Sequence, residues 1–367
     1  MFSSIKADYP KNSYQIYLSD NLSNNIEQYL KTFNNKSILI VADEYFNHEI
    51  NLPDKQLHKL FTSYNHIFIG GGVESKNLQG ALIILDKLNQ MSMTRDGCIV
   101  AIGGGVIGDL CAFVASLYQR GTSLVHIPTT LTSAVDSSIG GKTGINMYDA
   151  VNLLGTYFHP SASFIDLRFM KTLKNRDFAS GVAESIKKSF IYDKEFYNFI
   201  YNNSEKIFNK DLNYLYDLIH KSISIKLFHT ISDEKEKSIR LLLNYGHTFG
   251  QAFESVYGIN AKSLRHGEAV SLGMMCAAQM SESLYGNKNI IREHSEILAK
   301  YTLPTKLSCL KNIKIPNVEN LFSRLSKDKK RTVNGNRFVI CRSIGSAKIE
   351  HITDNNLIKS SFGLVLQ

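Results

Sequence analysis

Short runs of consecutive apolar residues recur through the first half of the chain, and segments with helical spacing separate them. The runs are bounded by Gly, Asp or Pro and cover 37–42, 66–69, 98–102, 124–127 and 164–165. Continuous apolar strands that alternate with helices are typical of a parallel sheet whose two faces are both covered. The first half therefore predicts an α/β fold.

After about Lys171 the strand pattern almost disappears. Helical spacing takes over in four segments, 190–208, 211–232, 238–257 and 268–285. Gly258 and Gly286 stand where C-terminal caps are expected, and 337–341 is one short strand-like run. We therefore predict an α/β domain over residues 1–172 and an α-helical domain over residues 173–367.

Composition places the chain among globular proteins. Its 367 residues are 43% hydrophobic with Gly 24 and Pro 6, which excludes a disordered or collagen-like chain and favours two domains. No apolar stretch approaches the ~20 residues of a membrane span. The first residues, Met1 to Tyr9, lack the apolar core of a secretory signal. We expect a cytoplasmic protein without a membrane partner.

Charge indicates the kind of ligand that the protein binds, and cysteine content indicates the redox compartment. Lys and Arg total 42 against 33 Asp and Glu, but the basic residues are spread along the chain and only 327–331 forms a basic run. This favours an anionic small-molecule substrate over nucleic acid. The five cysteines are scattered and form no CxxC pair. They predict core residues in a reducing compartment, without a disulfide framework or a thiolate zinc site.

A glycine-rich turn follows the strand predicted at 98–102. Gly103, Gly105 and Gly108 fit the GxGxxG pattern, in which glycine permits a tight turn and lets backbone N–H groups approach a pyrophosphate at a helix N-terminus. The acidic ribose ligand expected about 20 residues later is missing. Asp43, at the end of an earlier strand, could accept the ribose hydroxyls instead. A plain glycine turn is the alternative.

A polar stripe runs through the segment 238–257 and the residues just before it. Spacings of three or four residues put its members on one helical face: Glu236, Arg240, Asn244, His247 and Gln251. The other faces carry leucine, isoleucine and phenylalanine, so the predicted helix is mostly buried and its polar stripe faces a cleft. A solvated polar face is the ordinary alternative.

Two histidines and a glutamate suggest a metal site. His247 and His266 lie on successive segments, and Glu184 lies on an earlier helix with Lys187 one turn later. Two imidazoles and one carboxylate from separate helices form the ligand set of a catalytic zinc site with an open position for substrate. Spacing alone leaves open that these are ordinary core or surface residues.

Several motifs in a fixed order cover nearly the whole chain. They are GGGVIGD at 103–109, YQRG at 118–121, IPTTL at 127–131, VDSS at 135–138, GGKT at 140–143, AE and IK within 183–187, NYGHTFG at 244–250, HGEA at 266–269 and DKK at 328–330. In this order they resemble the 3-dehydroquinate synthase family, one of the sugar phosphate cyclases. The resemblance implies a Rossmann-like N-terminal domain that binds NAD and an α-helical C-terminal domain that binds metal and substrate.

The resemblance also implies the reaction. The family converts 3-deoxy-D-arabino-heptulosonate 7-phosphate to 3-dehydroquinate and phosphate, in the shikimate pathway to chorismate and the aromatic amino acids. It does so by NAD-mediated transient oxidation, elimination of phosphate, reduction and aldol cyclisation, with Zn²⁺ or Co²⁺ as the metal. A homodimer is implied as well, because Arg120 matches an arginine that reaches the partner subunit's site.

Site residues carry over position by position. The positions of the metal ligands are matched by Glu184, His247 and His266. Substrate contacts are matched by Asp136, Lys142, Asn152, Lys187, Lys226, Glu236, Arg240, Asn244, Gln251 and one of Lys329 or Lys330. Positions that bind NAD are matched by Asp43, Gly72, Lys76, Gly104, Gly105, Val106, Ile107, Gly108, Asp109, Thr129, Thr130, Lys142, Val151 and the segment from Phe169 to Thr172.

Three positions depart from the family pattern. Gln251 stands where the family commonly has a phosphate-contacting histidine, and glutamine can donate a hydrogen bond but cannot carry charge. Val151 replaces a lysine near the cofactor, and Val73 replaces an acidic NAD contact, for which Glu74 offers a substitute one residue later. These departures bear on rate, NAD affinity and substrate choice rather than on the fold.

Three alternatives remain open at this point. A sibling cyclase would act on another sugar phosphate, as in 2-deoxy-scyllo-inosose or 2-epi-5-epi-valiolone synthesis, but those siblings carry an acidic residue where this chain has Asn244. A polyol dehydrogenase that releases NADH would leave Lys142, Lys187 and Lys226 without an anion to bind. A degenerate, non-catalytic homologue would explain the departures but not an intact metal triad.

Overall fold

The computed structural model describes residues 1–33, 37–48, 52–148, 150–257, 263–326 and 336–367. The chain divides into two compact units. The first consists of Met1–Lys174 and Leu212–Leu227, and the second of Asn175–Asp211 and Phe228–Gln367. The predicted boundary after residue 172 falls beside this division, whereas the return of a helical segment to the first unit has no counterpart in the sequence pattern.

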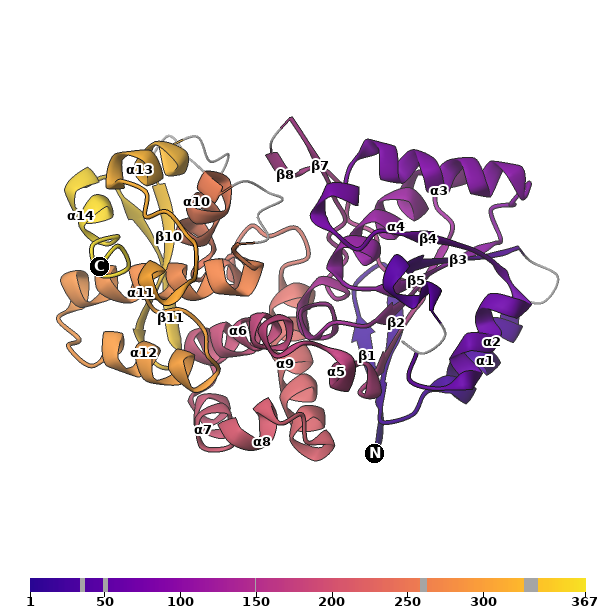
Figure 1. Cartoon of the computed structure of the whole chain (residues 1–367), viewed down its shortest axis with the longest axis horizontal. Coiled ribbons are helices and arrows are strands. Elements are labelled where there is room, and N and C mark those ends of the chain that lie inside the picture. Colours follow the sequence, from indigo (N-terminus) through magenta and orange to yellow (C-terminus); the bar gives the residue numbers. More distant parts are fainter. Residues whose placement is uncertain (34–36, 49–51, 149, 258–262, 327–335) are drawn as a thin grey trace. The chain divides into compact units, whose positions relative to one another are not determined.

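A seven-stranded sheet forms the first unit, in the order β1-β2-β9-β6-β5-β3-β4 (Figure 1). Its strands are β1 (Phe2–Asp8), β2 (Ser13–Ser19), β3 (Ile38–Asp43), β4 (Asn65–Ile69), β5 (Cys98–Gly103), β6 (Ser123–Pro128) and β9 (Ala162–Asp166). All neighbours from β2 to β4 pair in parallel. The five predicted strands and their parallel arrangement are confirmed.

The N-terminal hairpin was not predicted, and it makes the sheet mixed. Strand β1 pairs antiparallel with β2, which alternates buried Tyr14, Ile16 and Leu18 with more exposed residues. A half-buried strand shows alternation rather than a continuous apolar run. Strand β2 therefore contains no continuous apolar run that would indicate it in the sequence.

Helices cover the sheet and form its core. Helix α4 (Gly105–Leu117) packs on β5 and β6, and α3 (Leu78–Gln90) packs on α4. Buried Leu39, Val41 and Ile99 from the strands meet Leu110 and other apolar residues of these helices. The remaining elements of this unit are α1 (Ser23–Leu30), α2 (Lys55–Ser63), α5 (Arg168–Thr172) and a small hairpin of β7 (Ile145–Met147) and β8 (Ala150–Leu154).

The second unit is mainly helical, as expected. Its helices are α6 (Asn175–Tyr192), α7 (Lys194–Asn202), α8 (Ser204–Phe208), α10 (His247–Tyr257), α11 (His266–Tyr285), α12 (Ile290–Lys300), α13 (Val318–Ser326) and α14 (Asn355–Ser360). Helix α9 (Leu212–Ser232) belongs to the first unit up to Leu227. Gly286 ends α11 in the left-handed conformation, which confirms the cap predicted there, and Gly258 lies outside the described residues.

Three predictions for the second unit need correction. The segment predicted as helical over 190–208 is not one helix, because α6 ends at Tyr192 and the separate helices α7 and α8 follow it. In place of one short strand at 337–341, an antiparallel hairpin joins β10 (Asn336–Ser343) to β11 (Ser346–Ile352). The continuous helix over 238–257 is also wrong, because a 3-10 turn over Ile239–Asn244 precedes α10 and Gly246 separates the two at a φ of +74°. The polar stripe is therefore not one helical face.

Glycines let α10 and α11 approach each other closely. A Cβ atom on Gly246 would lie 2.9 Å from the Val270 carbonyl oxygen, and one on Gly273 would lie 1.9 Å from the Gly246 carbonyl oxygen. Contacts under 3.0 Å to backbone atoms leave no space for a methyl group. The helix break at Gly246 is thus fixed by tertiary packing, which local periodicity does not report.

All five cysteines are free thiols. Four are buried, as expected for core residues, but Cys309 is exposed and departs from that expectation. Within the described ranges, no helix is both long and apolar enough to cross a membrane.

Candidate metal and cofactor sites

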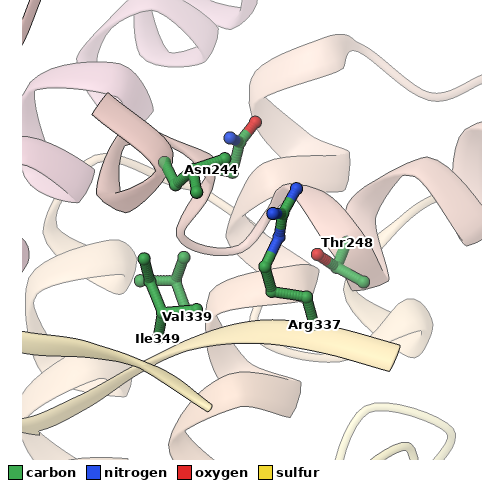
Figure 2. A pocket seen from close by; sticks show the side chains of 6 residues that line it. Asn244, Thr248, Arg337, Val339 and Ile349 are labelled. Carbon is green, nitrogen blue, oxygen red and sulfur yellow. The ribbon is translucent and has the colours of Figure 1, made fainter. Parts of the chain in front are cut away.

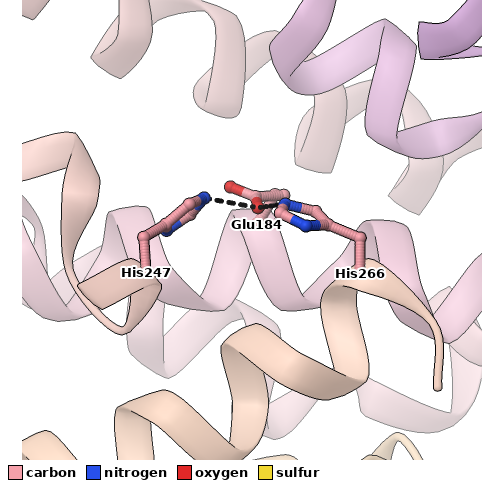
Figure 3. A group of neighbouring side chains, drawn as sticks. All are labelled: Glu184, His247 and His266. Carbon is pink, nitrogen blue, oxygen red and sulfur yellow. Dashed lines mark ion pairs between the residues drawn. The ribbon is translucent and has the colours of Figure 1, made fainter. Parts of the chain in front are cut away.

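Three helices of the second unit bring Glu184, His247 and His266 together (Figure 3). Glu184 lies in the middle of α6, and each histidine is the first residue of its helix, α10 or α11. One donor atom from each residue lies within 4.8 Å of the others. Glu184 Oε1 is 3.6 Å from His247 Nε2 and 3.3 Å from His266 Nε2.

The Nδ1 atom of each imidazole, which does not face Glu184, contacts an oxygen atom that orients the ring. His247 Nδ1 lies 3.2 Å from the Tyr245 carbonyl oxygen, and His266 Nδ1 lies 2.9 Å from Glu254 Oε1. In a neutral imidazole, an Nδ1–H that donates to an oxygen leaves the lone pair on Nε2, which is how metal-binding histidines are oriented. Both Nε2 atoms face the Glu184 carboxylate (Figure 3).

The electrostatics of the cluster favour an ionised carboxylate. Burial of Glu184 alone would raise its pKa, but the Lys187 ammonium group and the two imidazoles outweigh burial and hold that pKa well below its usual value. Lys187, one turn along α6, contacts Glu184 directly. Desolvation lowers the pKa of His266, but Glu254 and Glu184 overcome it and raise that pKa to about 10. The cluster thus favours positive charge beside Glu184.

Contacts between α6 and the start of α11 position two of the three donors. The Gly267 amide donates to Ser180 Oγ at 2.9 Å, and a Cβ on Gly267 would lie 2.1 Å from the Ser180 carbonyl oxygen. Glu268 accepts from the Arg176 Nε and Nη2 groups at 2.6 and 2.8 Å, and from the Arg265 amide at 2.8 Å. In the sequence His266-Gly267-Glu268, the histidine supplies a donor atom for the metal. The glycine lets α11 pack closely against α6, and the glutamate binds Arg176 of α6.

Two residues of the predicted polar stripe contact each other, although the stripe does not lie on one helix. Asn244 Nδ2 donates to Glu236 Oε1 at 2.8 Å. Arg240 is 2% exposed, and its Nη1 donates to the Glu234 carbonyl oxygen at 2.6 Å. Gln251 is half-buried one turn after His247 in α10.

Asp233 organises this turn, and the sequence analysis missed it. Its carboxylate accepts from the amides of Lys237, Ser238 and Arg240 at 2.9, 2.6 and 3.2 Å. Burial opposes ionisation, but these backbone donors lower the pKa of Asp233. Glu236 can then adopt a left-handed φ of +57° inside the turn. A single aspartate after a helix has no spacing pattern that would have found it.

In the first unit, predicted site residues form two groups. Lys226 Nζ, from α9, lies 2.9 Å from Asp136 Oδ1 and 2.5 Å from the Asp136 carbonyl oxygen. Asp136 lies in a π-helical turn, Ser133–Ser137, a feature common at functional sites. Lys76 Nζ, 8% exposed as a residue, donates to Asp109 Oδ2 and Asn152 Oδ1, both at 2.6 Å.

The glycine-rich turn has the predicted geometry. Strand β5 ends at Gly103, Gly104 is the N-cap of α4, and the helix begins at Gly105 and continues through Val106, Ile107, Gly108 and Asp109. Because Gly104 has no side chain, no cap from that residue competes for the first-turn amides, which can face an anion. Thr129 and Thr130 follow β6, and Phe169 and Thr172 lie in α5.

The carboxylates of Asp43 and Glu74 lie close to the backbone of Gly71 and Gly72, respectively. A Cβ on Gly71 would lie 1.8 Å from Asp43 Oδ2, and one on Gly72 would lie 2.2 Å from Glu74 Oε1. Burial raises the pKa of Asp43. Val73 is 37% exposed, so the departure at that position presents an apolar side chain to solvent, whereas Glu74 folds back over Gly72.

The remaining predicted residues are exposed or lie outside the described residues. Lys142 and Val151 are exposed. Arg120 is exposed in a left-handed turn in which Gln119, Arg120 and Gly121 have φ values of +52°, +61° and +120°. Lys329 and Lys330 lie outside the described residues.

Comparison with known proteins decides the family. The model of the 3-dehydroquinate synthase N-terminal domain matches residues 66–180, and that of the 3-dehydroquinate synthase C-terminal domain matches 181–331. The chain belongs to the 3-dehydroquinate synthase family. A curated 3-dehydroquinate synthase from Dictyoglomus turgidum is 35% identical over 358 residues, covering 96% of each chain. One from Buchnera aphidicola is 36% identical over 355 residues, covering 95% of this chain and 97% of that protein.

Solved structures show that the 3-dehydroquinate synthase family shares its fold with other cyclases. The 2-epi-5-epi-valiolone synthase ValA of Streptomyces hygroscopicus, solved with NAD⁺ and Zn²⁺, has a TM-score of 0.86 at 22% identity and covers 98% of both chains. A 2-deoxy-scyllo-inosose synthase, solved with carbaglucose-6-phosphate, NAD⁺ and Co²⁺, has a TM-score of 0.84 at 22% identity, covering 98% of this chain and 99% of that one. The predicted fold class is confirmed.

Proposed function

We propose that this chain is a 3-dehydroquinate synthase. It converts 3-deoxy-D-arabino-heptulosonate 7-phosphate to 3-dehydroquinate and phosphate, a carbon–oxygen lyase reaction of the shikimate pathway. The observation that carries the proposal is the cluster of Glu184, His247 and His266 in a chain related to curated synthases over almost its whole length. The free, mostly buried thiols agree with action in the reducing cytoplasm.

The donor set of the second unit fits a divalent Zn²⁺ or Co²⁺ ion. An ionised carboxylate and two imidazole Nε2 atoms leave a coordination position for substrate. Glu254 and the Tyr245 carbonyl fix the two rings, as partners of metal-bound histidines do. Before an ion binds, the cationic Lys187 and the two imidazoles stabilise the negative charge of Glu184.

The first unit fits NAD. The uncapped first turn of α4 offers backbone amides to a pyrophosphate, and Asp43 stands at the end of the neighbouring strand β3, where ribose hydroxyls can donate to it. Lys76 and Asp109 form a buried ion pair at the same helix. The exposed Lys142 and Val151 complete the set of NAD positions that the resemblance implies.

The polar residues of each unit have separable tasks. When bound, the metal supplies a Lewis acid to a substrate hydroxyl and NAD supplies a hydride acceptor. Glu236 and Asn244 form an acceptor and donor pair suited to hydroxyl groups, and Lys226 is held by Asp136 as a cation for the substrate's anionic groups. Gln251 donates a hydrogen bond where a charged histidine is usual.

Arg120 supports a homodimer. Two consecutive non-glycine residues, Gln119 and Arg120, hold left-handed φ values, and such strain of about 1–3 kcal/mol per residue persists mainly at functional sites. The turn leaves Arg120 exposed. We infer that it presents this side chain to a second copy of the chain, as the resemblance implies.

Metal analysis tests the ligand assignment. We expect His247→Ala to lose both bound metal and turnover, because one of three protein donors is removed. His66→Ala, in the exposed edge strand β4, is the matched control and should keep both. Metal at full stoichiometry in purified His247→Ala would contradict the assignment, whatever the remaining turnover.

A further inference from the structure

A small pocket in the second unit lies against the hairpin β10–β11 (Figure 2). Its lining residues are Leu241, Asn244, Thr248, Arg337, Val339 and Ile349. Arg337 and Val339 are two residues apart in β10 and share a face, and Val339 pairs directly with Ile349 of β11. The sheet face therefore forms an apolar floor with one arginine at its edge.

Two residues that line the pocket are close in sequence to the metal-binding candidate His247. Asn244 and Thr248 lie on either side of His247, in the 3-10 turn and the first turn of α10. Figure 2 shows the Arg337 side chain rising from β10 toward Asn244, with Thr248 beside it. A guanidinium group is thus added to the polar groups already described, from a strand that the family motifs do not include.

Arg337 differs from other arginines of this unit. Arg176 binds Glu268, Arg265 binds Asp177, and Arg342 lies over the Tyr285 ring at 5.0 Å. Arg337 is half-buried, yet no hydrogen bond or ion pair to its guanidinium is found within the described ranges. The guanidinium donors of Arg337 are therefore available to an anion that enters the pocket from outside.

We propose that Arg337 binds an anionic oxygen group, a carboxylate or a phosphate, of a ligand held beside Asn244. The planar guanidinium fork matches either group with two parallel hydrogen bonds. The apolar walls formed by Leu241, Val339 and Ile349 strengthen that attraction by lowering the local dielectric constant. The substrate of a 3-dehydroquinate synthase carries both a carboxylate and a phosphate, so the proposed function names a ligand with either group. The identity of that ligand rests on the proposed function, whereas the binding of an anion by Arg337 does not.

The competing explanation is packing alone, because an arginine stem can cover apolar surface while its head stays in water. Arg337→Gln removes the charge, Arg337→Lys keeps it without the fork, and Arg342→Gln removes one charge from the same strand outside the pocket. Calorimetric titration of the protein loaded with NAD and metal would use two probes, inorganic phosphate and 3-dehydroquinate, which has a carboxylate and no phosphate.

We expect Arg337→Gln to bind one probe about tenfold to a hundredfold more weakly, the usual range for hydrogen bonds to charged groups. The probe that weakens identifies the anion. Arg337→Lys should fall between Arg337→Gln and the unmodified protein, and Arg342→Gln should match the unmodified protein. Affinities of Arg337→Gln within twofold for both probes would overturn the proposal, as would equal weakening of both together with a lower melting temperature.

This result is separable from the proposed function. Selective weakening of phosphate binding in a protein that does not turn over 3-deoxy-D-arabino-heptulosonate 7-phosphate would support the role of Arg337 and reject the activity. Turnover with unchanged binding of both probes by Arg337→Gln would support the activity and reject the role of Arg337.

Discussion

Glu254 shows how single side chains outside the donor set shape the metal cluster. It lies within the same helix as His247 but contacts the imidazole of His266, with its Oε1 2.9 Å from Nδ1. A carboxylate behind an imidazole fixes the ring and makes its Nε2 a stronger donor. Glu254 is therefore a positioning residue for the metal.

Glu254→Gln should weaken binding of Zn²⁺ or Co²⁺ by about tenfold to a hundredfold, the usual effect of losing such a partner. Glutamine keeps the shape of the side chain and removes its charge. Competition with a chromophoric chelator measures the affinity. Glu296→Gln, at an exposed position of α12, is the control. Equal affinities in Glu254→Gln and the unmodified protein would show that His266 needs no partner.

Single side chains also mark where sequence reasoning stops. The donors Glu184, His247 and His266 could be selected because their residue types and motifs are distinctive. Glu254 and Asp233 could not, since a lone carboxylate has no characteristic spacing and its partners are set by packing. Arg337 was noticed only as part of a strand-like run, because its lack of a partner is visible only in three dimensions.

At the scale of elements, close helix contacts fix the metal cluster. Gly267 lets α11 start against Ser180 of α6, and Gly273 lets the same helix pack against the turn at Gly246. Both contacts leave less than the space of a methyl group. Small residues at these crossings thus determine how near the three donors can come.

Gly267→Ala should separate the start of α11 from α6. The added methyl group would lie 2.1 Å from the Ser180 carbonyl oxygen, so the helices must shift apart. We expect a loss of about 1–3 kcal/mol in the free energy of unfolding and weaker metal binding. Urea unfolding and metal titration measure the two effects. Unchanged metal affinity would show that the contact does not position His266.

The turn between α9 and α10 gives a second prediction at this scale. Asp233→Ala removes the acceptor of three backbone amides, and with it the constraint on Glu236 and Arg240. We expect KM for the sugar phosphate to rise while metal affinity stays unchanged. Asp233→Asn, which keeps a carbonyl acceptor, should show a smaller rise. A fall in kcat and metal content at constant KM would contradict this role.

The same elements explain the success and failure of the sequence patterns. The parallel strands were predictable because burial on both faces leaves uninterrupted apolar runs such as β5, all of whose residues are buried. The helix over 238–257 was wrongly predicted because the carbonyl of Gly246 contacts α11, a long-range constraint absent from local periodicity. Hairpin β1–β2 was missed because its burial alternates.

At the scale of the whole molecule, each unit contains a deeply buried histidine whose pKa is lowered by burial. Burial lowers the pKa of His126 to about 4 and that of His294 to about 3. His294 Nδ1 lies 2.6 Å from the Ile290 carbonyl oxygen, and its Nε2 lies 2.7 Å from the Tyr245 hydroxyl. The neutral ring therefore donates through Nδ1 and accepts at Nε2, and protonation at Nε2 would require the Tyr245 hydroxyl to accept instead of donate.

Stability should fall as pH falls below about 6.5, the value of an unfolded histidine. The unfolded chain then takes up protons that the folded chain does not, so each site lowers the free energy of unfolding by about 1.4 kcal/mol per pH unit. The effect should end near pH 4 for His126 and near pH 3 for His294. Urea unfolding between pH 7.5 and 5 measures it.

His294→Gln provides the comparison, because glutamine does not titrate. We expect this variant to be less stable at pH 7.5 but to lose less stability than the unmodified protein when the pH is lowered to 5. Parallel losses in the two proteins would show that His294 titrates normally in the folded state.

The most direct test of the account is phosphate release by the purified protein with NAD and Zn²⁺ or Co²⁺. Three substrates are offered side by side: 3-deoxy-D-arabino-heptulosonate 7-phosphate, glucose 6-phosphate and sedoheptulose 7-phosphate. The account predicts phosphate release with the first alone and no net NADH, despite Gln251 and Val151. Release only with one of the other two would make this chain a sibling cyclase, and absence of release from all three in a metal-loaded protein would contradict catalysis of this kind.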